Sequence, residues 1–480
     1  MISKSFLKSS LVFTIGGALP MLAGIILLPF YTNYLSALHY TQLLFYISVS
    51  LFFQVLFSFS IESYFGIKYT QLNASPEEQK RFIGTTSLLL LLIGALLLLV
   101  LALFGNGIFH LIWRKDFEME FWPYGFFSLL TAFFNAYFKT SSVVLIYLKK
   151  PSQFLISNIV NFFATLIISI GGLYLYPDSI IGPMYGRLLS GVVIFLFGHF
   201  VFIKNGIFKL TRGFIKELMQ FCAPYSFYAI CIWILGQVDR YFLQSYISNI
   251  DLNAYDLMLK CFFGIEFLQN SLSAVIFPKL YELWSASKEN TTTPETNRYS
   301  NVFTAINILQ LIVFCIALPM VYQLIIHNET FYQSEKYIGL IAAGYALRSI
   351  LNFYLSTILF TKNIGVLLKI FGVSAVFQLL ITVTMIERFG LMGAIYASLA
   401  TKILQISLCS FFTKGIFKFE FNYFKIIVIP FIYILINVLQ YFFIPEYNAV
   451  LYFIQLFLFG TLFYFVYRNE IKKVWHNLLG

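Results

Sequence analysis

The sequence has little charge. Asp, Glu, Lys and Arg make up 11% of its 480 residues, whereas a soluble globular domain has roughly 25%. Hydrophobic residues make up 59%, and the mean hydropathy is +0.81. A chain with so few charges cannot cover its surface with polar groups. The composition therefore excludes a soluble protein and predicts an integral membrane protein.

Cysteines and catalytic motifs are also scarce. None of the five cysteines forms a CxxC pair, and all lie in or beside apolar runs, so we expect no disulfide framework and no metal site. The sequence contains no P-loop, no HExxH motif and no pair of carboxylates within one loop that would serve as an acid and a base. We therefore expect a protein that is not an enzyme and that needs no cofactor.

The positive net charge follows from membrane topology. The chain has 32 Lys and Arg against 21 Asp and Glu, a net charge of +11. Most cations lie in short loops between apolar runs, which argues against nucleic-acid binding. If the N-terminus is cytoplasmic, the loops on the opposite side contain only Arg114, Lys115, Lys336 and Arg388. The positive-inside rule then predicts that both termini are cytoplasmic.

Long apolar runs dominate the chain. A transmembrane helix needs about 20 apolar residues, and the runs predict an all-α membrane protein of about fourteen spans with a tight turn at 387–389. The predicted spans are 10–32, 41–66, 86–104, 121–148, 153–175, 180–203, 218–242, 254–280, 301–326, 337–361, 364–386, 390–413, 426–444 and 449–467.

The spans predict four regions. Residues 1–205 form an N-terminal six-helix lobe, 206–217 a basic cytoplasmic linker, 218–413 a C-terminal six-helix lobe, and 414–480 two further spans with a cytoplasmic tail. Two related six-helix halves are a common transporter plan, with the substrate site at their interface.

A short internal echo supports the two halves. Pro20 in the first span matches Pro224 in the seventh. The segment Tyr34-Leu-Ser36 matches Tyr246-Ile-Ser248.

Seven cations lie within spans, against three embedded or edge acids, Glu62, Asp239 and Glu266. A charge at mid-bilayer costs about 2.5–3.5 kcal/mol on insertion scales, so such residues usually face a bundle interior or water. The excess of cations predicts a hydrated cationic cavity. Its candidate substrate-binding residues are Arg348, Lys402, Arg187, Lys260, Arg240, Lys139 and Lys369.

Two alternatives remain for individual cations. Lys139 and Lys369 lie near span ends, where a long side chain can reach the interface. Arg240 follows Asp239 directly, and the pair could simply end the seventh span.

Polar residues three or four positions apart share a helix face and extend the predicted cavity. Any single stripe could instead make interhelical hydrogen bonds, worth about 0.6 kcal/mol each. The predicted polar lining is Gln54, Glu62, Asn135, Asn158, Asn161, Asn352 and Gln405.

Several short motifs, together with the fourteen spans, carry a family resemblance. They are Phe13-Thr-Ile-Gly-Gly with Leu19-Pro20, Leu27-Leu-Pro29-Phe-Tyr31, Tyr34-Leu-Ser36, Asp239-Arg240-Tyr-Phe-Leu and Phe277-Pro278. The chain resembles the polysaccharide flippase branch of the MOP (multidrug/oligosaccharidyl-lipid/polysaccharide) exporter superfamily, which has a MATE-like fold. The turn Leu38-His39-Tyr40-Thr41 departs from the acidic-Tyr-Gly pattern usual there.

The resemblance implies a multi-pass protein of the bacterial inner membrane. It would move an undecaprenyl-pyrophosphate-linked oligosaccharide to the outer leaflet by alternating access, for O-antigen, lipopolysaccharide or related surface polysaccharide, with Na⁺ or H⁺ as a candidate coupling ion. Independently, Arg and Lys donors suit pyrophosphate. An inside-negative potential also favours outward movement of each negative charge by about 2.3 kcal/mol per 100 mV.

Two other functions compete. A cation-coupled multidrug antiporter of the same superfamily needs buried acids in the first and seventh spans, but the first has none and the seventh has only Asp239 at its edge. A membrane-embedded glycan polymerase or ligase needs a large outer loop with catalytic groups, and no predicted outer loop is long enough.

Overall fold

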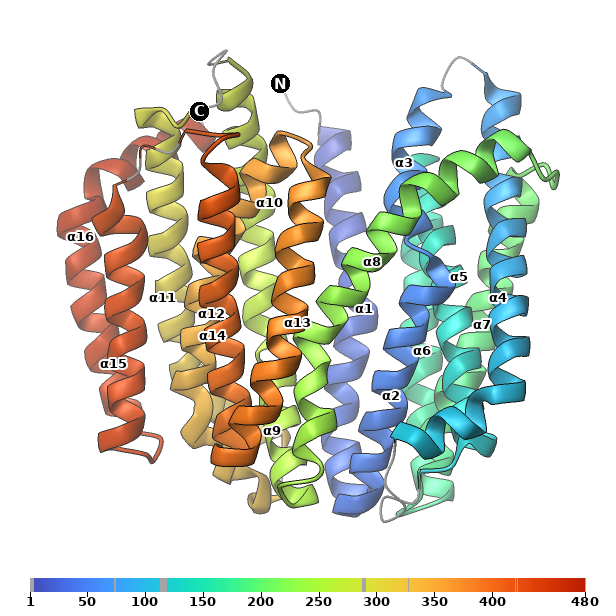
Figure 1. The fold of residues 1–480 in the computed structure, drawn as a ribbon, viewed down its shortest axis with the longest axis horizontal. Coiled ribbons are helices and arrows are strands. Elements are labelled where there is room, and N and C mark those ends of the chain that lie inside the picture. Colours follow the sequence, from blue (N-terminus) through green and yellow to red (C-terminus); the bar gives the residue numbers. More distant parts are fainter. Residues whose placement is uncertain are drawn as a thin grey trace. The chain divides into compact units, whose positions relative to one another are not determined.

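The computed structural model describes residues 4–72, 75–112, 119–286, 291–326, 328–418, 420 and 422–479. Arg114 and Lys115 of the predicted outer loops lie outside these residues. The described residues are almost entirely helical (Figure 1). Fourteen helices or joined helix pairs are long and apolar enough to cross a membrane, which confirms the predicted all-α membrane fold.

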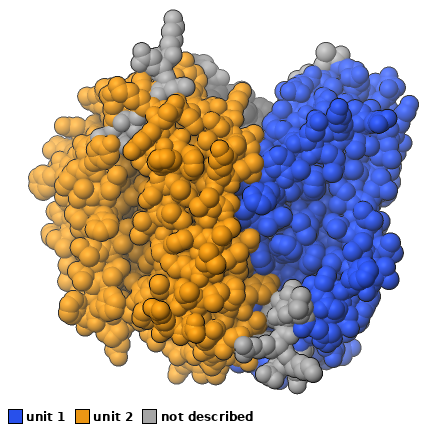
Figure 2. Space-filling model, in the orientation of Figure 1, with its two compact units in different colours: residues 1–233 blue, residues 234–480 orange. Residues whose placement is uncertain are grey.

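The chain divides into two compact units, Met1–Trp233 (unit 1) and Ile234–Gly480 (unit 2), shown in different colours in Figure 2. The boundary lies inside helix α8. The helices up to this boundary are α1 (Lys4–Tyr34), α2 (Ala37–Ser58), α3 (Ile61–Gln71), α4 (Pro76–Ile112), η2 (Phe121–Gly125), α5 (Phe126–Tyr147), α6 (Pro151–Leu175), α7 (Ile181–Asn205) and the first part of α8 (Arg212–Leu243).

Unit 2 contains the rest of α8. Its other helices are α9 (Asn249–Cys261), α10 (Phe263–Ala286), α11 (Pro294–Ile325), η3 (Glu329–Tyr337), α12 (Ile338–Phe360), α13 (Ile364–Phe389), α14 (Leu391–Thr413), η4 (Phe424–Val428), α15 (Ile429–Phe443) and α16 (Ala449–Leu479). The predicted linker 206–217 comprises a non-helical stretch, 206–211, and the first turns of α8.

The second and eighth spans are each built from two helices. Phe59 and Ser60, with φ of 46° and 51°, separate α2 from α3. Phe262 separates α9 from α10. Broken helices at corresponding positions in two halves of a transporter commonly mark the substrate site. The break in each unit is therefore the first place to look for functional side chains.

The short sequence echo has a structural basis. Ser36 is the N-cap of α2, and its Oγ accepts a hydrogen bond from the His39 amide at 3.4 Å. Ser248 is the N-cap of α9, and its Oγ accepts from the Asp251 amide at 3.1 Å. Both serines thus satisfy a backbone donor that the first helical turn leaves free.

The predicted turn at 387–389 is wrong in position. Helix α13 continues through Phe389, and Gly390 alone separates it from α14. Gly390 has φ 56° and ψ −132°, a conformation that a residue with a Cβ atom rarely adopts. Two adjacent charges, Glu387 and Arg388, favoured a loop in the sequence analysis. A helix end tolerates charged residues when their side chains are exposed, and the side chains of Glu387 and Arg388 are both exposed.

Helices α15 and α16 pack against earlier helices of unit 2. Helix α16 lies against α11, and α15 lies against α12. The Lys425 ammonium contacts Glu470 Oε1 at 3.0 Å, and the Asn301 amide donates to the same oxygen at 3.1 Å. These contacts join η4, α11 and α16 at one end of the bundle.

Candidate functional site

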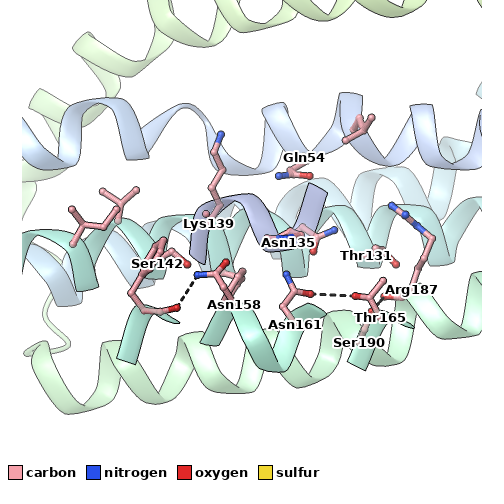
Figure 3. A pocket seen from close by; sticks show the side chains of 17 residues that line it. Gln54, Thr131, Asn135, Lys139, Ser142, Asn158, Asn161, Thr165, Arg187 and Ser190 are labelled. Carbon is pink, nitrogen blue, oxygen red and sulfur yellow. Dashed lines mark hydrogen bonds between the residues drawn. The ribbon is translucent and has the colours of Figure 1, made fainter. Parts of the chain in front are cut away.

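Unit 1 contains a cavity of about 500 Å³, bordered by α1, α2, α5, α6 and α7 (Figure 3). We call it the unit 1 cavity. It brings together six of the candidate residues from the sequence. Its polar lining is Gln54, Thr131, Asn135, Lys139, Ser142, Asn158, Asn161, Thr165, Arg187 and Ser190.

Two helical stripes form most of this lining. Thr131, Asn135 and Lys139 are spaced by four residues on α5, and Asn158 and Asn161 by three on α6. At 1.5 Å per residue, the α5 stripe runs about 12 Å from Thr131 to Lys139. The amide side chains therefore form a row of hydrogen-bond donors and acceptors along the cavity wall. Arg187, near Thr131, lies at one end of this row and Lys139 toward the other (Figure 3).

The Arg187 guanidinium lines the cavity near the start of α7. Within the part of the chain that the structure describes, its side chain makes no hydrogen bond and has no carboxylate within 4.0 Å. A guanidinium has five N–H donors in a planar fork that fits phosphate and carboxylate oxygens. Arg187 is therefore free to bind an oxyanion in the cavity.

Lys139 is paired with Glu62. Its ammonium lies 2.7 Å from Glu62 Oε1, and Glu62 lies in the first turn of α3, just after the break in the second span. The Lys139 side chain is 53% exposed and that of Glu62 is 13% exposed. Glu62 Oε2 is buried and has no hydrogen-bond partner among the described residues. Glu62 itself does not line the cavity. Its contact with Lys139 links this carboxylate to the cavity lining.

Unit 2 has a similar pair. Arg348 on α12 donates to Glu266 Oε1 at 2.8 Å and to Asn270 Oδ1 at 3.4 Å. Glu266 lies in the first turn of α10, just after the break in the eighth span, as Glu62 does after the break in the second. Each unit therefore has a carboxylate–cation pair whose acid lies just after the break in a broken span.

Lys402 lies beside this second pair. Its Nζ is 5.3 Å from the centre of the Tyr345 ring, and Arg348 Cζ is 5.9 Å from the same ring. Cations within about 6 Å of a ring face are attracted to it. No carboxylate in the described ranges lies within 4.0 Å of the Lys402 ammonium. The cluster of Glu266, Arg348 and Lys402 thus carries one excess positive charge.

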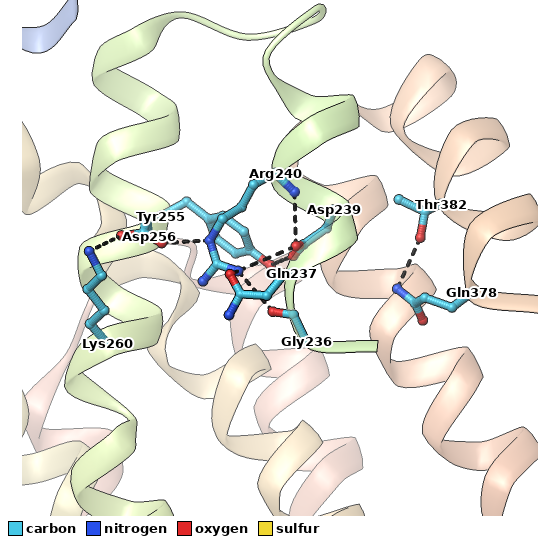
Figure 4. Close-up of polar contacts among 9 residues, drawn as sticks. All are labelled: Gly236, Gln237, Asp239, Arg240, Tyr255, Asp256, Lys260, Gln378 and Thr382. Carbon is cyan, nitrogen blue, oxygen red and sulfur yellow. Dashed lines mark hydrogen bonds and ion pairs between the residues drawn. The ribbon is translucent and has the colours of Figure 1, made fainter. Parts of the chain in front are cut away.

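Arg240 and Lys260 belong to a closed ion network (Figure 4). Arg240 Nε donates to Asp256 Oδ1 at 2.6 Å, and Lys260 Nζ lies 2.7 Å from Asp256 Oδ2. The Tyr255 hydroxyl donates to Asp239 Oδ2 at 2.7 Å. The Arg240 and Asp256 side chains are only 7% and 4% exposed. Two cations here face two carboxylates, so the network is neutral and ties α8 to α9.

The sequence analysis missed Asp256. It lies four residues before Lys260, a spacing that puts both side chains on one helix face. That spacing is the signal that could have found it. The partner Arg240 comes from another helix, so no local pattern reveals that contact.

The remaining candidates belong to unit 2 and are not part of the unit 1 cavity lining. Gln405 is buried in α14, Asn352 is half-buried in α12, and Lys369 is exposed near the start of α13. The structure does not bring Lys369 into an ion pair with any described residue.

No protein-family model matches this chain, and no curated protein matches it. Solved structures do match. The structure of the lipid II flippase MurJ in an inward closed conformation aligns with 98% of this chain and 100% of its own, at 15% identity and a TM-score of 0.67. An inward-facing multidrug resistance MATE family transporter of the MOP superfamily aligns with 86% of this chain and 96% of its own, at 13% identity and a TM-score of 0.58.

The structure of a Vibrio cholerae MATE transporter also aligns, with 86% of this chain and 97% of its own chain, at 14% identity and a TM-score of 0.58. At such low identities the match establishes the fold. The expected MATE-like fold is therefore confirmed: this chain has the architecture shared by flippase and MATE transporter structures of the MOP type.

Proposed function

We propose that this protein is a flippase. It moves an undecaprenyl-pyrophosphate-linked oligosaccharide from the cytoplasmic to the outer leaflet of the bacterial inner membrane, for cell-surface polysaccharide synthesis. The observation that carries the proposal is the unpaired Arg187 guanidinium in an amide-lined cavity within a membrane-embedded unit. A cation within a membrane span is costly unless it faces water or an anion, so a cavity that exposes one suits an anionic substrate.

The charged and the amide side chains of the cavity lining suit the pyrophosphate and the sugars of this substrate, respectively. The pyrophosphate diester is an anion, and Arg187 and Lys139 supply charged donors for its oxygens. Sugar hydroxyls both donate and accept hydrogen bonds. The amides of Gln54, Asn135 and Asn158 do the same.

Unit 2 supplies a second group of cations. Lys402 has no carboxylate partner in the described part of unit 2. Arg348 and Lys402 both lie over the ring of Tyr345. We assign both to contact with the same anionic substrate. Arg240 and Lys260 have their donors engaged by Asp239 and Asp256, so we assign them to holding α8 and α9 together.

The comparisons support a lipid-linked glycan over a drug. The lipid II flippase aligns with 98% of the chain and the MATE transporters with 86%. Among the described residues, the lining of the unit 1 cavity contains no carboxylate, whereas a site for cationic drugs or for a coupling cation would need one. The multidrug antiporter is therefore the weaker proposal.

The membrane potential favours the proposed direction. A pyrophosphate diester carries about two negative charges, so its outward movement gains about 4.6 kcal/mol per 100 mV at 2.3 kcal/mol per charge.

The test is a flipping assay in proteoliposomes with labelled undecaprenyl-pyrophosphate-linked oligosaccharide. We expect Arg187→Ala and Lys402→Ala each to lower the rate at least tenfold, because each removes an unpaired cation. Arg388→Ala is the matched control, since Arg388 is exposed at the end of α13, and it should flip at the wild-type rate. Wild-type rates in both Arg187→Ala and Lys402→Ala would refute the proposed substrate contacts. Drug efflux without lipid flipping would favour the antiporter.

A further inference from the structure

We propose that the segment joining α7 to α8 docks onto the anionic phospholipid headgroups of the adjacent membrane leaflet. The segment comprises residues 204–216, and we call its exposed side the 204–216 surface. It belongs to unit 1 and runs from the end of α7 into α8 (Figure 1). This inference goes beyond the proposed function and does not rest on it, because it concerns the lipids around the protein rather than the substrate that it moves.

The 204–216 surface is strongly basic. The segment contains no Asp or Glu. Its four cations are all exposed, namely Lys204, Lys209, Arg212 and Lys216. Within the part of the chain that the structure describes, none of the four has a carboxylate within 4.0 Å. The next acid along the chain, Glu217, is engaged by Lys68 at 2.5 Å. The positive charge of this surface is therefore not neutralised by the protein itself.

Apolar side chains lie between these cations. Ile207, Phe208 and Leu210 are 39%, 40% and 47% exposed. Alternating cationic and apolar side chains are typical of segments that lie in the bilayer interface, where the apolar groups enter the acyl boundary and the cations meet the phosphates. Membrane topology alone accounts for cations in a loop, but it does not account for exposed apolar side chains among them.

The position of the segment in the chain brings it to the bilayer surface. Helices α7 and α8 are both long and apolar enough to cross a membrane, and residues 206–211 connect them. Even a fully extended connection of this length reaches at most about 20 Å. The segment therefore stays close to the headgroups of the leaflet at which α7 ends.

Helix α4 holds the backbone of this segment in place. The Ile207 amide donates to the Lys80 carbonyl at 2.9 Å, and the Thr85 hydroxyl donates to the Lys209 carbonyl at 2.7 Å. Gly84 allows this close approach, because a Cβ atom there would collide with the Ile207 carbonyl oxygen. The surface is thus formed before any lipid binds, so binding costs little ordering of the chain.

Charge complementarity identifies the ligand as an anionic phospholipid. Phosphate oxygens accept hydrogen bonds from ammonium and guanidinium donors, and the acyl chains beside them take up the exposed apolar side chains. Each Lys or Arg near an anionic leaflet strengthens the association about fivefold. A zwitterionic headgroup such as that of phosphatidylcholine has no net charge to offer. We therefore expect the 204–216 surface to select phosphatidylglycerol over phosphatidylcholine.

The experiment places a fluorophore on the surface. Gly213 lies between Arg212 and Lys216, is exposed, and has no atom within 4 Å of the position of a Cβ. In a full-length variant without the native cysteines, Gly213→Cys is labelled with bimane. The protein is reconstituted into phosphatidylcholine vesicles that contain the same small fraction of nitroxide-labelled phosphatidylglycerol or nitroxide-labelled phosphatidylcholine. We expect the phosphatidylglycerol to quench bimane at least about twofold more strongly.

Two double variants of the labelled protein test whether the preference belongs to this surface. Lys209→Gln with Arg212→Gln should bring the ratio of the two quenching efficiencies toward one. Lys80→Gln with Arg81→Gln is the matched control and should keep the original ratio. It removes the same charge from the same end of unit 1, but these cations lie beside Glu77 and Glu78, and Arg81 pairs with Glu77 at 2.6 Å.

Three results would overturn the proposal. Equal quenching by the two lipids, before any cation is changed, would show that the surface does not select anionic lipid and would favour an acidic soluble partner. Quenching by neither lipid would place the segment away from the bilayer. An equal loss of preference in the two double variants would show that the net charge of this end of unit 1, rather than the 204–216 surface, attracts the lipid. The first two results need neither double variant to fold.

Discussion

The cations within the membrane spans differ in what each one contacts. Arg187 and Lys402 have no carboxylate partner among the described residues, and Lys139 and Arg348 have one each. Arg240 is held by Asp239 and Asp256. An unpaired or exchangeable cation is available to a substrate, whereas a fully paired one stabilises the fold. The contacts of each cation therefore separate candidate binding residues from structural ones.

The Asp256 network makes a prediction about stability. Asp256→Asn removes the carboxylate that the buried Arg240 shares with Lys260. Breaking a buried pair in this way typically costs about 3–5 kcal/mol. We expect a clearly lower thermal unfolding temperature in detergent. Glu282→Gln, which breaks the exposed pair with Lys279, is the control and should cost less than about 1 kcal/mol. Equal unfolding temperatures for the two variants would contradict a stabilising role for the network.

At the scale of helices, the breaks in the second and eighth spans determine where the carboxylates of Glu62 and Glu266 lie. Each break restarts a helix inside a span, and Glu62 and Glu266 fall in the first turn of the restarted helix. A helix N-terminus carries a partial positive charge that favours an anion there. The break therefore provides a site where a carboxylate can be tolerated within an apolar segment.

A loop contact outside the spans is sensitive to pH. Asp178, between α6 and α7, accepts a hydrogen bond from the Ser36 amide at 2.6 Å and contacts His39 Nδ1 at 2.9 Å. The hydrogen bond with His39, followed by that with Ser36, lowers the pKa of Asp178. A lowered pKa means that the contact stabilises the fold above the unfolded value of about 3.9, and that this contribution is lost as the pH falls through the folded value.

Asp178→Asn tests this contact. Asp178 has φ 50°, and asparagine tolerates that conformation, so the change removes charge with little backbone strain. We expect the variant to be less stable than wild type at pH 7 by no more than about 1 kcal/mol, since the site is exposed. The difference should shrink below about pH 4. Unfolding curves at pH 7 and pH 3.5 measure it, and a difference that does not change with pH would show that charge is not involved.

At the scale of the whole molecule, orientation in the membrane is the open prediction. The distribution of Lys and Arg predicts cytoplasmic termini. In a variant without the native cysteines, Glu446→Cys between α15 and α16 should react with an impermeant maleimide in intact cells. Glu78→Cys at the start of α4 should react only after the membrane is opened. Both side chains are exposed, so the reverse labelling pattern would place the termini outside.

The sequence by itself determined the fold class and the number of spans. Insertion of a helix into lipid depends on the hydropathy of about 20 consecutive residues, which is a local property. Helical spacing is local too, which is why the stripes containing Asn135 and Lys139 on α5 and Asn158 and Asn161 on α6 could be expected to share one face, as they do in the cavity lining.

Only the tertiary structure decided which cations are paired. Glu62 reaches Lys139 across 77 positions of sequence, and Glu266 reaches Arg348 across 82. Arg240 and Asp256 come from different helices. Such contacts depend on how helices pack against one another, and neither the hydropathy nor the period of a single helix contains that information. For the same reason the unpaired state of Arg187, on which the proposed site depends, became visible only when its neighbours from other helices were in place.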